Sequence, residues 1–217
     1  MRQSKGEVRI PTQARAQRTR ATLVRAAQAQ FSAHGYSATT AKSIAEAAGV
    51  ATGSFYQYFT DKDAVLRELA TLRVRGLAER LGHLLAPTAD AAVARNRLLA
   101  VVEAVAAYYR DDRGLHAVVS ERRYADPELG AILSGGEAAL VEDIRRLLCA
   151  LRYEGDVDAT ALTVFRTVEG VVRAQVLRER IVSDERCYAA LIGVLVGLTG
   201  LHADTASQAP RVPAPAC

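Results

Sequence analysis

The pattern of residues 39–62, TTAKSIAEAAGVATGSFYQYFTDK, predicts two short helices joined by a tight turn. Apolar residues fall on one narrow face of the first half, and Thr40 before them is a suitable N-cap, so we predict a helix over residues 41–48. Gly49 ends this helix, because glycine tolerates the left-handed conformation that closes a helix. Any fold of the chain must accommodate this pair of steeply crossing helices.

The second helix of the pair is predicted over residues 52–59. Phe55 and Phe59 lie four residues apart and face inward, whereas the outward face is small, polar and uncharged. Such a face suits the DNA major groove, because small residues allow close approach and polar side chains exchange hydrogen bonds with base edges. The spacing leaves one alternative, a helical hairpin that packs two apolar faces with the aromatic residues as core. The residues predicted to face outward are Thr52, Gly53, Tyr56 and Gln57.

The run AxxAGVxxGSFYxYFxxKxxxL, residues 45–66, resembles the DNA-binding motif of the TetR family of bacterial one-component repressors. The resemblance covers residues 20–68 and implies a supporting helix over residues 44–49 and a recognition helix over residues 52–59. It implies base reading by Thr52, Gly53 and Gln57 and backbone contacts by Tyr56, Tyr58 and Lys62. Hydroxyl groups suit phosphate contacts on chemical grounds as well, which adds Thr39, Thr40 and Ser54 to the DNA-binding candidates.

The chain departs from the family pattern at one position. The family often has Ser or Thr after the AGV triplet as the N-cap of the recognition helix, and this chain has Ala51. Thr52 is then the candidate cap, a role that would remove its side chain from base contact.

The rest of the chain shows helical periodicity and no alternating strand pattern, so we predict an all-α fold of about nine helices. A helix over residues 19–34 backs the two described above. The helix from residue 62 to 85 would span roughly 36 Å at 1.5 Å per residue, enough to run from one domain into the next. The other helices are expected over residues 91–110, 115–124, 127–152, 158–181 and 184–202.

Four parts follow from this reading. They are a basic flexible arm (1–17), a helix-turn-helix DNA-binding domain (18–61), a helical ligand-binding and dimerisation domain (62–202) and a disordered tail (203–217). Charge is distributed unevenly among them, because residues 1–80 hold 13 Lys or Arg against 6 Asp or Glu and the remainder holds 15 against 18. The basic half is the one that carries the helix pair, as a phosphate-binding surface requires.

The resemblance also implies a cavity for a small molecule in the second domain. Polar groups among aliphatic walls would orient a mostly apolar ligand there. For each candidate residue the alternative is an ordinary core or surface role. The candidates on the enclosing helices are Tyr108, Tyr109, His116, Arg122, Tyr124 and Phe165.

The last two helices are apolar on more than one face, and one face is enough to pack a helix onto its own domain. We therefore expect a four-helix dimer interface to which each subunit contributes two helices, as the resemblance also implies. The alternative is a helix buried wholly within one subunit. The residues predicted to face the partner subunit are Leu191, Gly193, Val194, Gly197, Leu198 and Leu201.

The chain has no GxSxG, HExxH, P-loop or CxxC motif, the patterns that often mark catalytic or metal-binding sites. We therefore predict no enzyme activity, no cofactor and no metal. The start of the chain has no apolar segment typical of a secretory signal, and the longest uncharged run, residues 187–203, is shorter than the ~20 residues that span a bilayer. A cytoplasmic protein without a membrane partner is expected.

These observations predict a homodimeric repressor that binds a palindromic DNA operator and is released by a small, mostly apolar effector. Three alternatives stay open: a sequence-nonspecific nucleoid-type DNA binder, an activator of the same fold, and a ligand-binding enzyme or carrier that has lost DNA function.

Overall fold

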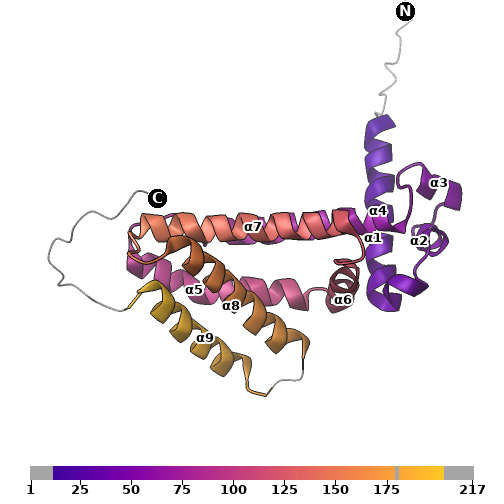
Figure 1. Ribbon diagram of the computed structural model, residues 1–217. Helices are drawn as coiled ribbons and strands as arrows, with labels where there is room; N and C mark the ends of the chain where they lie inside the picture. Colours follow the sequence, from indigo (N-terminus) through magenta and orange to yellow (C-terminus); the bar gives the residue numbers. More distant parts are fainter. Residues whose placement is uncertain (1–11, 179–180, 203–217) are drawn as a thin grey trace, which may run out of the picture.

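The computed structural model describes residues 12–178 and 181–202, and within these ranges the chain forms nine α-helices and no strand, as predicted (Figure 1). Three helices lie at one end of the molecule, and six more form an elongated bundle beside them. The end domain contains α1 (Thr12–Ala38), α2 (Ala41–Ala47) and α3 (Thr52–Tyr56). The bundle contains α4 (Lys62–Gly82), α5 (Ala91–Arg110), α6 (Arg113–Arg122), α7 (Pro127–Ala150), α8 (Val157–Leu177) and α9 (Asp184–Thr199).

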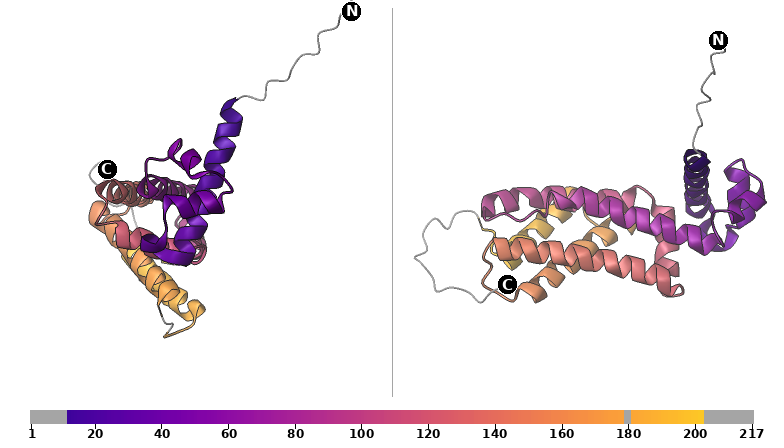
Figure 2. Two further views of the ribbon diagram at one scale, coloured as in Figure 1. Left: turned by 90° about the vertical axis from the view of Figure 1, so that its right-hand side faces the viewer. Right: turned by 90° about the horizontal axis from the view of Figure 1, so that it is seen from above.

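Helix α1 is longer than predicted and lies across the end of the bundle (Figure 2). It begins at Thr12, so residues 12–17, expected in the flexible arm, are helical. The rest of the arm and the predicted tail lie outside the described residues. At Gly35, where the helix was predicted to end, the backbone leaves helical geometry with φ 74° and ψ −178°. Only glycine adopts this conformation readily, which explains the kink at this position.

Side-chain caps set the starts of most helices. Every helix after α1 except α3 begins after a residue whose side-chain oxygen accepts a hydrogen bond from a backbone N–H of the first turn. Such caps satisfy donors that a helix leaves unpaired. The capping residues are Thr40, Asp61, Asp90, Asp112, Asp126, Asp156 and Ser183.

Helix α4 contributes to two separate hydrophobic cores. Val65, Leu66 and Leu69 in its first half pack into the core of the end domain, whereas Leu81 near its end packs into the core of the bundle. The apolar side chains of this helix are therefore divided between the two cores, and Leu72 between them is 47% exposed. One rigid helix thus connects the two cores.

Helices α4 and α7 pack closely at Gly136, where an added Cβ would collide with the side chain of Val74. The adjacent Gly135 has open space at the same position. Of this glycine pair, then, only Gly136 is needed for the close approach of the two helices. None of the described helices is both long enough and apolar enough to cross a lipid bilayer.

Candidate DNA interface and ligand cavity

Helices α2 and α3 form the predicted helix-turn-helix. Ile44, Ala45 and Phe55 are fully buried against α1, so the faces predicted to point inward do so. The turn between the helices passes through Gly49 at φ 69° and is closed by a 3.0 Å hydrogen bond from Val50 N to Ala45 O. The glycine and the buried residues together fix the direction in which α3 points away from the domain.

The outward face of α3 carries no charged side chain. Gly53, Tyr56 and Gln57 are exposed and Thr52 is half-buried, and a Cβ added at Gly53 would meet no atom within 4 Å. Tyr56, at 58% exposure, presents its ring and hydroxyl to solvent. This face is small, polar and accessible, the properties that a helix needs to approach base edges.

Helix α3 is shorter than predicted and starts differently. It ends at Tyr56, so Tyr58 and Phe59 follow the helix. Ala51 is the N-cap residue and makes no side-chain capping bond, and Thr52 is the first helical residue. The suggestion that Thr52 caps the helix is therefore wrong, because its hydroxyl is not held by the backbone N–H groups of the first turn.

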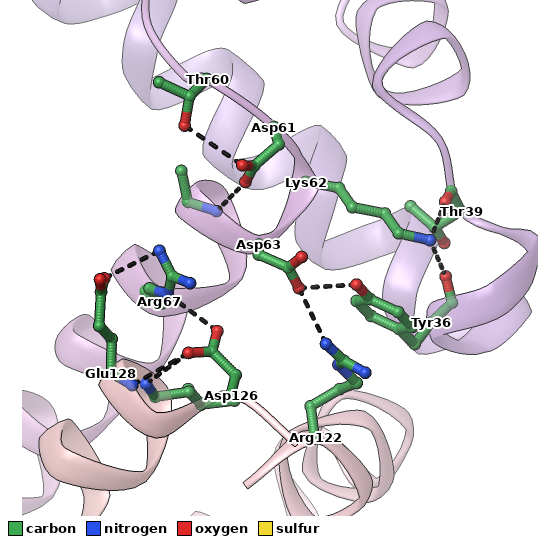
Figure 3. A network of polar contacts seen from close by, with 12 residues as sticks. Tyr36, Thr39, Thr60, Asp61, Lys62, Asp63, Arg67, Arg122, Asp126 and Glu128 are labelled. Carbon is green, nitrogen blue, oxygen red and sulfur yellow. Dashed lines mark hydrogen bonds and ion pairs between the residues drawn. The ribbon is translucent and has the colours of Figure 1, made fainter. Parts of the chain in front are cut away.

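Three of the residues predicted to contact phosphate use their polar groups within the domain. Thr39 is fully buried and its hydroxyl donates to Gly35 O at 2.7 Å. Thr40 forms a reciprocal capping box with Ser43. The Lys62 ammonium donates to Tyr36 O at 2.8 Å and to Thr39 O at 2.9 Å, so it links the start of α4 to the end of α1 (Figure 3). Ser54 and Tyr58 are half-buried.

Exposed cations on α1 and α2 were not among the predicted DNA contacts. Arg15 and Arg18 lie on the first turns of α1, and Lys42 lies on α2. The sequence places these residues in the basic half of the chain, but only the extended α1 shows that Arg15 belongs to an ordered helix rather than to the arm. They add positive charge to the domain that carries α3.

Arg122 lies beside Tyr36 and Asp63 at the junction between the two domains (Figure 3) and is not among the residues that line the cavity described below. Its guanidinium lies 4.1 Å from the centre of the Tyr36 ring and 3.6 Å from an oxygen of Asp63. The Tyr36 hydroxyl donates to the same carboxylate at 2.7 Å, and burial together with this bond raises the pKa of Tyr36 to about 12. The structure does not support the prediction that Arg122 binds a ligand, because its guanidinium instead joins α6 to the end domain.

Two further contacts join α6 to α1. A Cβ added at Gly114 would lie within 2.7 Å of Ser32 Cα, so the two backbones approach as closely as only glycine allows. The Asp112 carboxylate accepts hydrogen bonds from Gln28 at 2.8 Å and from Ser32 at 2.7 Å while it caps α6. Burial alone would raise the pKa of Asp112, but these hydrogen bonds outweigh it and lower the pKa.

A cavity of about 250 Å³ lies within the bundle. Its walls are mostly aliphatic side chains from α4 to α9. Five of the six predicted ligand residues line it, and Arg123 does so in place of Arg122. Tyr124, 90% exposed, stands at the rim. The predicted residues that line the cavity are Tyr108, Tyr109, His116, Tyr124 and Phe165.

The two carboxylates that line the cavity are both paired with arginines. Glu169 lies 3.1 Å from Arg173 and accepts a 3.3 Å hydrogen bond from the Tyr109 hydroxyl. Glu137 forms ion pairs with Arg123 and, at 3.0 Å, with Arg166. Burial acts to raise the pKa of Glu137, but the hydrogen bonds and charges of the two arginines lower it below the usual value. Glu137 is thus an anion at neutral pH.

His116 on α6 also lines the cavity. Its ring packs edge-on against Tyr109 with centroids 4.8 Å apart, and its Nε2 lies 3.2 Å from the Ser120 hydroxyl. Burial, with smaller contributions from the positive charges of Arg73 and Arg173, lowers the pKa of His116 to about 4. The imidazole is therefore neutral at physiological pH and offers a hydrogen bond without a charge.

The predicted dimer residues fall into two groups. Gly193, Val194 and Gly197 are exposed along one face of α9, with Val194 at 50% exposure. Leu191 and Leu201 are buried in the core of their own subunit, at 3% and 5% exposure, and Leu198 is half-buried against that core. The prediction that Leu191 and Leu201 face a partner is therefore wrong. A helix that is apolar on more than one face does not reveal from its sequence which face packs into its own subunit.

Within the described residues no group of His, Cys, Asp and Glu side chains is arranged to hold a metal ion.

Known proteins resemble this chain in sequence over the helix-turn-helix segment. Residues 23–69 match the model of the family described as bacterial regulatory proteins, tetR family. A segment of 58 residues is 43% identical to the probable acrEF/envCD operon repressor of Escherichia coli K12, and to that of strain O157:H7. This segment is 27% of the chain and 26% of those proteins, so the chain matches only about a quarter of the length of these relatives.

Solved structures match along most of the chain. A transcriptional regulator from Pseudomonas aeruginosa PAO1 has a TM-score of 0.69 at 20% identity, covering 90% of this chain and 97% of that one. A TetR-family regulator from Mesorhizobium loti has a TM-score of 0.68 at 16% identity, covering 86% and 98%. The fatty acid degradation regulator FadR from Bacillus halodurans has a TM-score of 0.61 at 22% identity, covering 92% and 96%. These likenesses concern the fold along most of the chain, and the sequence match is confined to the helix-turn-helix segment; over residues 23–69 the chain is similar to the bacterial regulatory proteins of the tetR family.

Proposed function

We propose that the protein is a transcriptional repressor that binds a palindromic operator as a dimer and leaves it when a small molecule occupies the bundle cavity. The observation that carries the proposal is the outward face of α3, where Gly53, Tyr56 and Gln57 are exposed and uncharged on a basic domain. The match of the helix-turn-helix segment to a probable repressor supports the same role.

A dimer supplies the second reading helix that a palindrome requires. The exposed face of α9 suits this role, because Gly193 and Gly197 lie one helical turn apart and leave room for another helix to approach closely. Val194, exposed beside them, offers apolar surface. Half-sites would then be separated by about one turn of DNA, roughly 34 Å, or a multiple of it.

Helix α6 is placed to couple the cavity to DNA binding. One side of it carries His116, Ser120 and Arg123 in the cavity wall, and the other carries Gly114 and Arg122 against the DNA-binding domain. A ligand that displaces α6 would shift α1 and the first half of α4 with it. The ligand must bind the non-DNA state more tightly to have this effect, and by linkage DNA must then weaken ligand binding equally.

The test begins with duplexes selected by the full-length protein from a random pool, which are then compared with shuffled duplexes at one fixed salt concentration by fluorescence anisotropy. We expect the selected duplexes to contain inverted half-sites and to bind roughly a thousandfold more tightly or better than shuffled DNA. Equal affinity for both would establish the nucleoid-type alternative and overturn the proposal.

A matched pair of variants tests whether the outward face of α3 contacts the bases. Gln57→Ala is expected to weaken binding to the selected duplex by about 1–3 kcal/mol while leaving binding to shuffled DNA nearly unchanged. Asn96→Ala is the control, because it removes an exposed amide from α5 in the bundle. Equal behaviour of the two variants would show that α3 does not read the bases.

A further inference from the structure

The cavity has a charge arrangement that restricts its ligand. Each charged side chain that lines it already has a partner: Glu137 with Arg123, Glu169 with Arg173, and Arg97 with the carbonyl oxygen of Ala86 at 3.0 Å. A charged ligand would have to leave water and compete with one of these existing pairs. Burying a charge without a partner costs several kcal/mol, and the groups that could offset it are already engaged, both carboxylates with arginines and Arg97 with a neutral carbonyl oxygen.

A cation meets a second obstacle at the wall formed by α6. The positive charges of Arg73 and Arg173 act on His116 in addition to the effect of burial, and all three disfavour a proton on its ring. A ligand ammonium placed against this ring would be repelled by the same arginines. An anion there would be attracted by these arginines, but it would be repelled by the carboxylate of Glu169, which pairs with Arg173 and lies against Tyr109 beside the His116 ring.

Among the uncharged polar groups that line the cavity, one pair suits an uncharged end group of the ligand. The neutral His116 ring and the Ser120 hydroxyl, 3.2 Å apart, can donate and accept hydrogen bonds. Most of the remaining wall is apolar, with Leu140, Phe165 and Val168 among its buried residues. A molecule that is apolar along its length and polar at one end matches this distribution.

The volume limits the length of the ligand. At ~30 Å³ for a water-sized group, 250 Å³ holds roughly eight such groups, or about ten non-hydrogen atoms when covalent bonds bring them closer together. This is below the range of about 300–1,000 Å³ that is usual for pockets of drug-sized ligands. The effector is therefore a compact molecule.

We propose that the effector is an uncharged, mostly apolar molecule of about ten non-hydrogen atoms with a single hydrogen-bonding end group, such as a hydroxyl or carbonyl, seated against His116. The assignment rests on the proposed function, in which this cavity is the effector site. It specifies the chemical class of the effector, which neither the fold nor the helix-turn-helix determines.

Three probes of matched size compare an uncharged, an anionic and a cationic end group. They are 1-nonanol, octanoate and nonylammonium, each of about ten non-hydrogen atoms. Binding to the full-length protein without DNA is measured by isothermal titration calorimetry and by thermal shift, below the solubility limit of nonanol and below the micelle concentration of the two ions. We expect nonanol to bind and to raise the melting temperature, and both ions to bind roughly tenfold more weakly or worse. An ion that binds as tightly as nonanol, or no binding of nonanol, would overturn the proposal.

Variants locate the end group. His116→Phe keeps an aromatic ring but loses the hydrogen bond, so nonanol should lose most of its advantage over butylbenzene, a probe of similar size without a hydrogen-bonding group. His83→Phe, at the exposed C-cap of α4, is the matched control and should keep that advantage. An unchanged advantage in folded His116→Phe would refute the seating against His116. If that variant does not fold, Val168→Phe, which fills the cavity, should abolish nonanol binding, and retained binding would refute the site.

Addition of nonanol to the complex with selected DNA distinguishes the two proposals. Binding to the free protein together with release of DNA supports both. Binding without release leaves the ligand class standing and refutes the response proposed for the repressor. Absence of binding refutes the ligand class while sequence-specific DNA binding stands on its own measurement.

Discussion

The guanidinium of Arg122 on α6 lies 4.1 Å from the centre of the Tyr36 ring on α1, and the ammonium of Lys62 on α4 lies 3.9 Å from the same ring (Figure 3). One aromatic side chain thus contacts cations from two other helices. Asp63 completes the group by accepting a hydrogen bond from Tyr36 and pairing with Arg122. The ring is one of the points at which the helical bundle contacts α1.

Replacement of Arg122 by methionine tests this contact, because methionine keeps an apolar stem and loses the cation. We expect the free energy of unfolding to fall by about 1 kcal/mol and the effector to release DNA less completely, since α6 is no longer held to Tyr36. Arg113→Met, exposed on the same helix, is the control. Chemical denaturation and DNA binding with and without effector give the two quantities, and identical results for both variants would contradict the role of Arg122.

Gly114→Ala should separate α6 from α1. The added methyl group would meet backbone atoms of Ser32, which have no side-chain freedom with which to move aside. We expect a loss of about 1–3 kcal/mol, as is typical of overpacking. Gly135→Ala should have the opposite effect, because its site on α7 is open and alanine forms helices better than glycine. We expect the free energy of unfolding to rise by about 0.5–1 kcal/mol. Equal melting temperatures for the two variants would rule out the tight contact at Gly114.

Val194→Asp should convert the proposed dimer into a monomer, because it places a charge on the exposed apolar face of α9. Val93→Asp, a change at a similarly exposed valine on α5, should leave the oligomeric state unchanged. Analytical ultracentrifugation reports the mass, and circular dichroism checks that both variants remain helical. A dimer that persists in Val194→Asp would place the interface elsewhere.

Asp126 links stability to pH. Its carboxylate is 4% exposed, accepts a 2.8 Å hydrogen bond from Arg67 and caps α7. Burial acts to raise the pKa of Asp126, but Arg67 and the backbone N–H groups of Leu129 and Glu128 lower it below 3.8. A folded pKa below the unfolded one means that the stabilisation is fully present above pH 3.8 and is lost as the pH falls through the folded pKa.

Asp126→Asn isolates this charge, because asparagine also caps helices well. We expect it to lower the free energy of unfolding by about 1–3 kcal/mol at pH 7, with a difference from the unmodified protein that shrinks at pH values below about 3.8. Asp156→Asn, at the exposed cap of α8, serves as the comparison and should have a much smaller effect. Urea denaturation across pH measures both, and a difference that stays constant on acidification would contradict the ion-pair account.

The order and type of the helices were predictable because their signals are local. Asp61, Asp90 and Asp126 mark helix starts by their capping chemistry, and Gly49 marks a turn by its conformational freedom. The helix-turn-helix was predictable for the same reason, since its apolar faces follow from spacing within a short segment. Helix ends were less accurate, as α3 and α4 show, because the last turn depends on what packs against it.

The roles of individual side chains were harder to predict. Arg122 and Arg123 are neighbours in sequence, yet one contacts Tyr36 and the other lines the cavity. About 100° of helical rotation separates adjacent residues, so the orientation of α6 decides which arginine faces which domain. Lys62 likewise matches a phosphate contact by position, but its ammonium bonds to carbonyl oxygens at the end of α1.

By itself the sequence determined an all-helical chain with a helix-turn-helix near its start whose second helix has an uncharged outer face, because periodicity, caps and a turn glycine act between residues a few positions apart. Only the tertiary structure decided that α6 touches Tyr36 with one side and the cavity with the other, and that Leu191 and Leu201 belong to the subunit core. Those contacts join segments far apart in the chain, and their pairing depends on how whole helices pack together rather than on any local pattern.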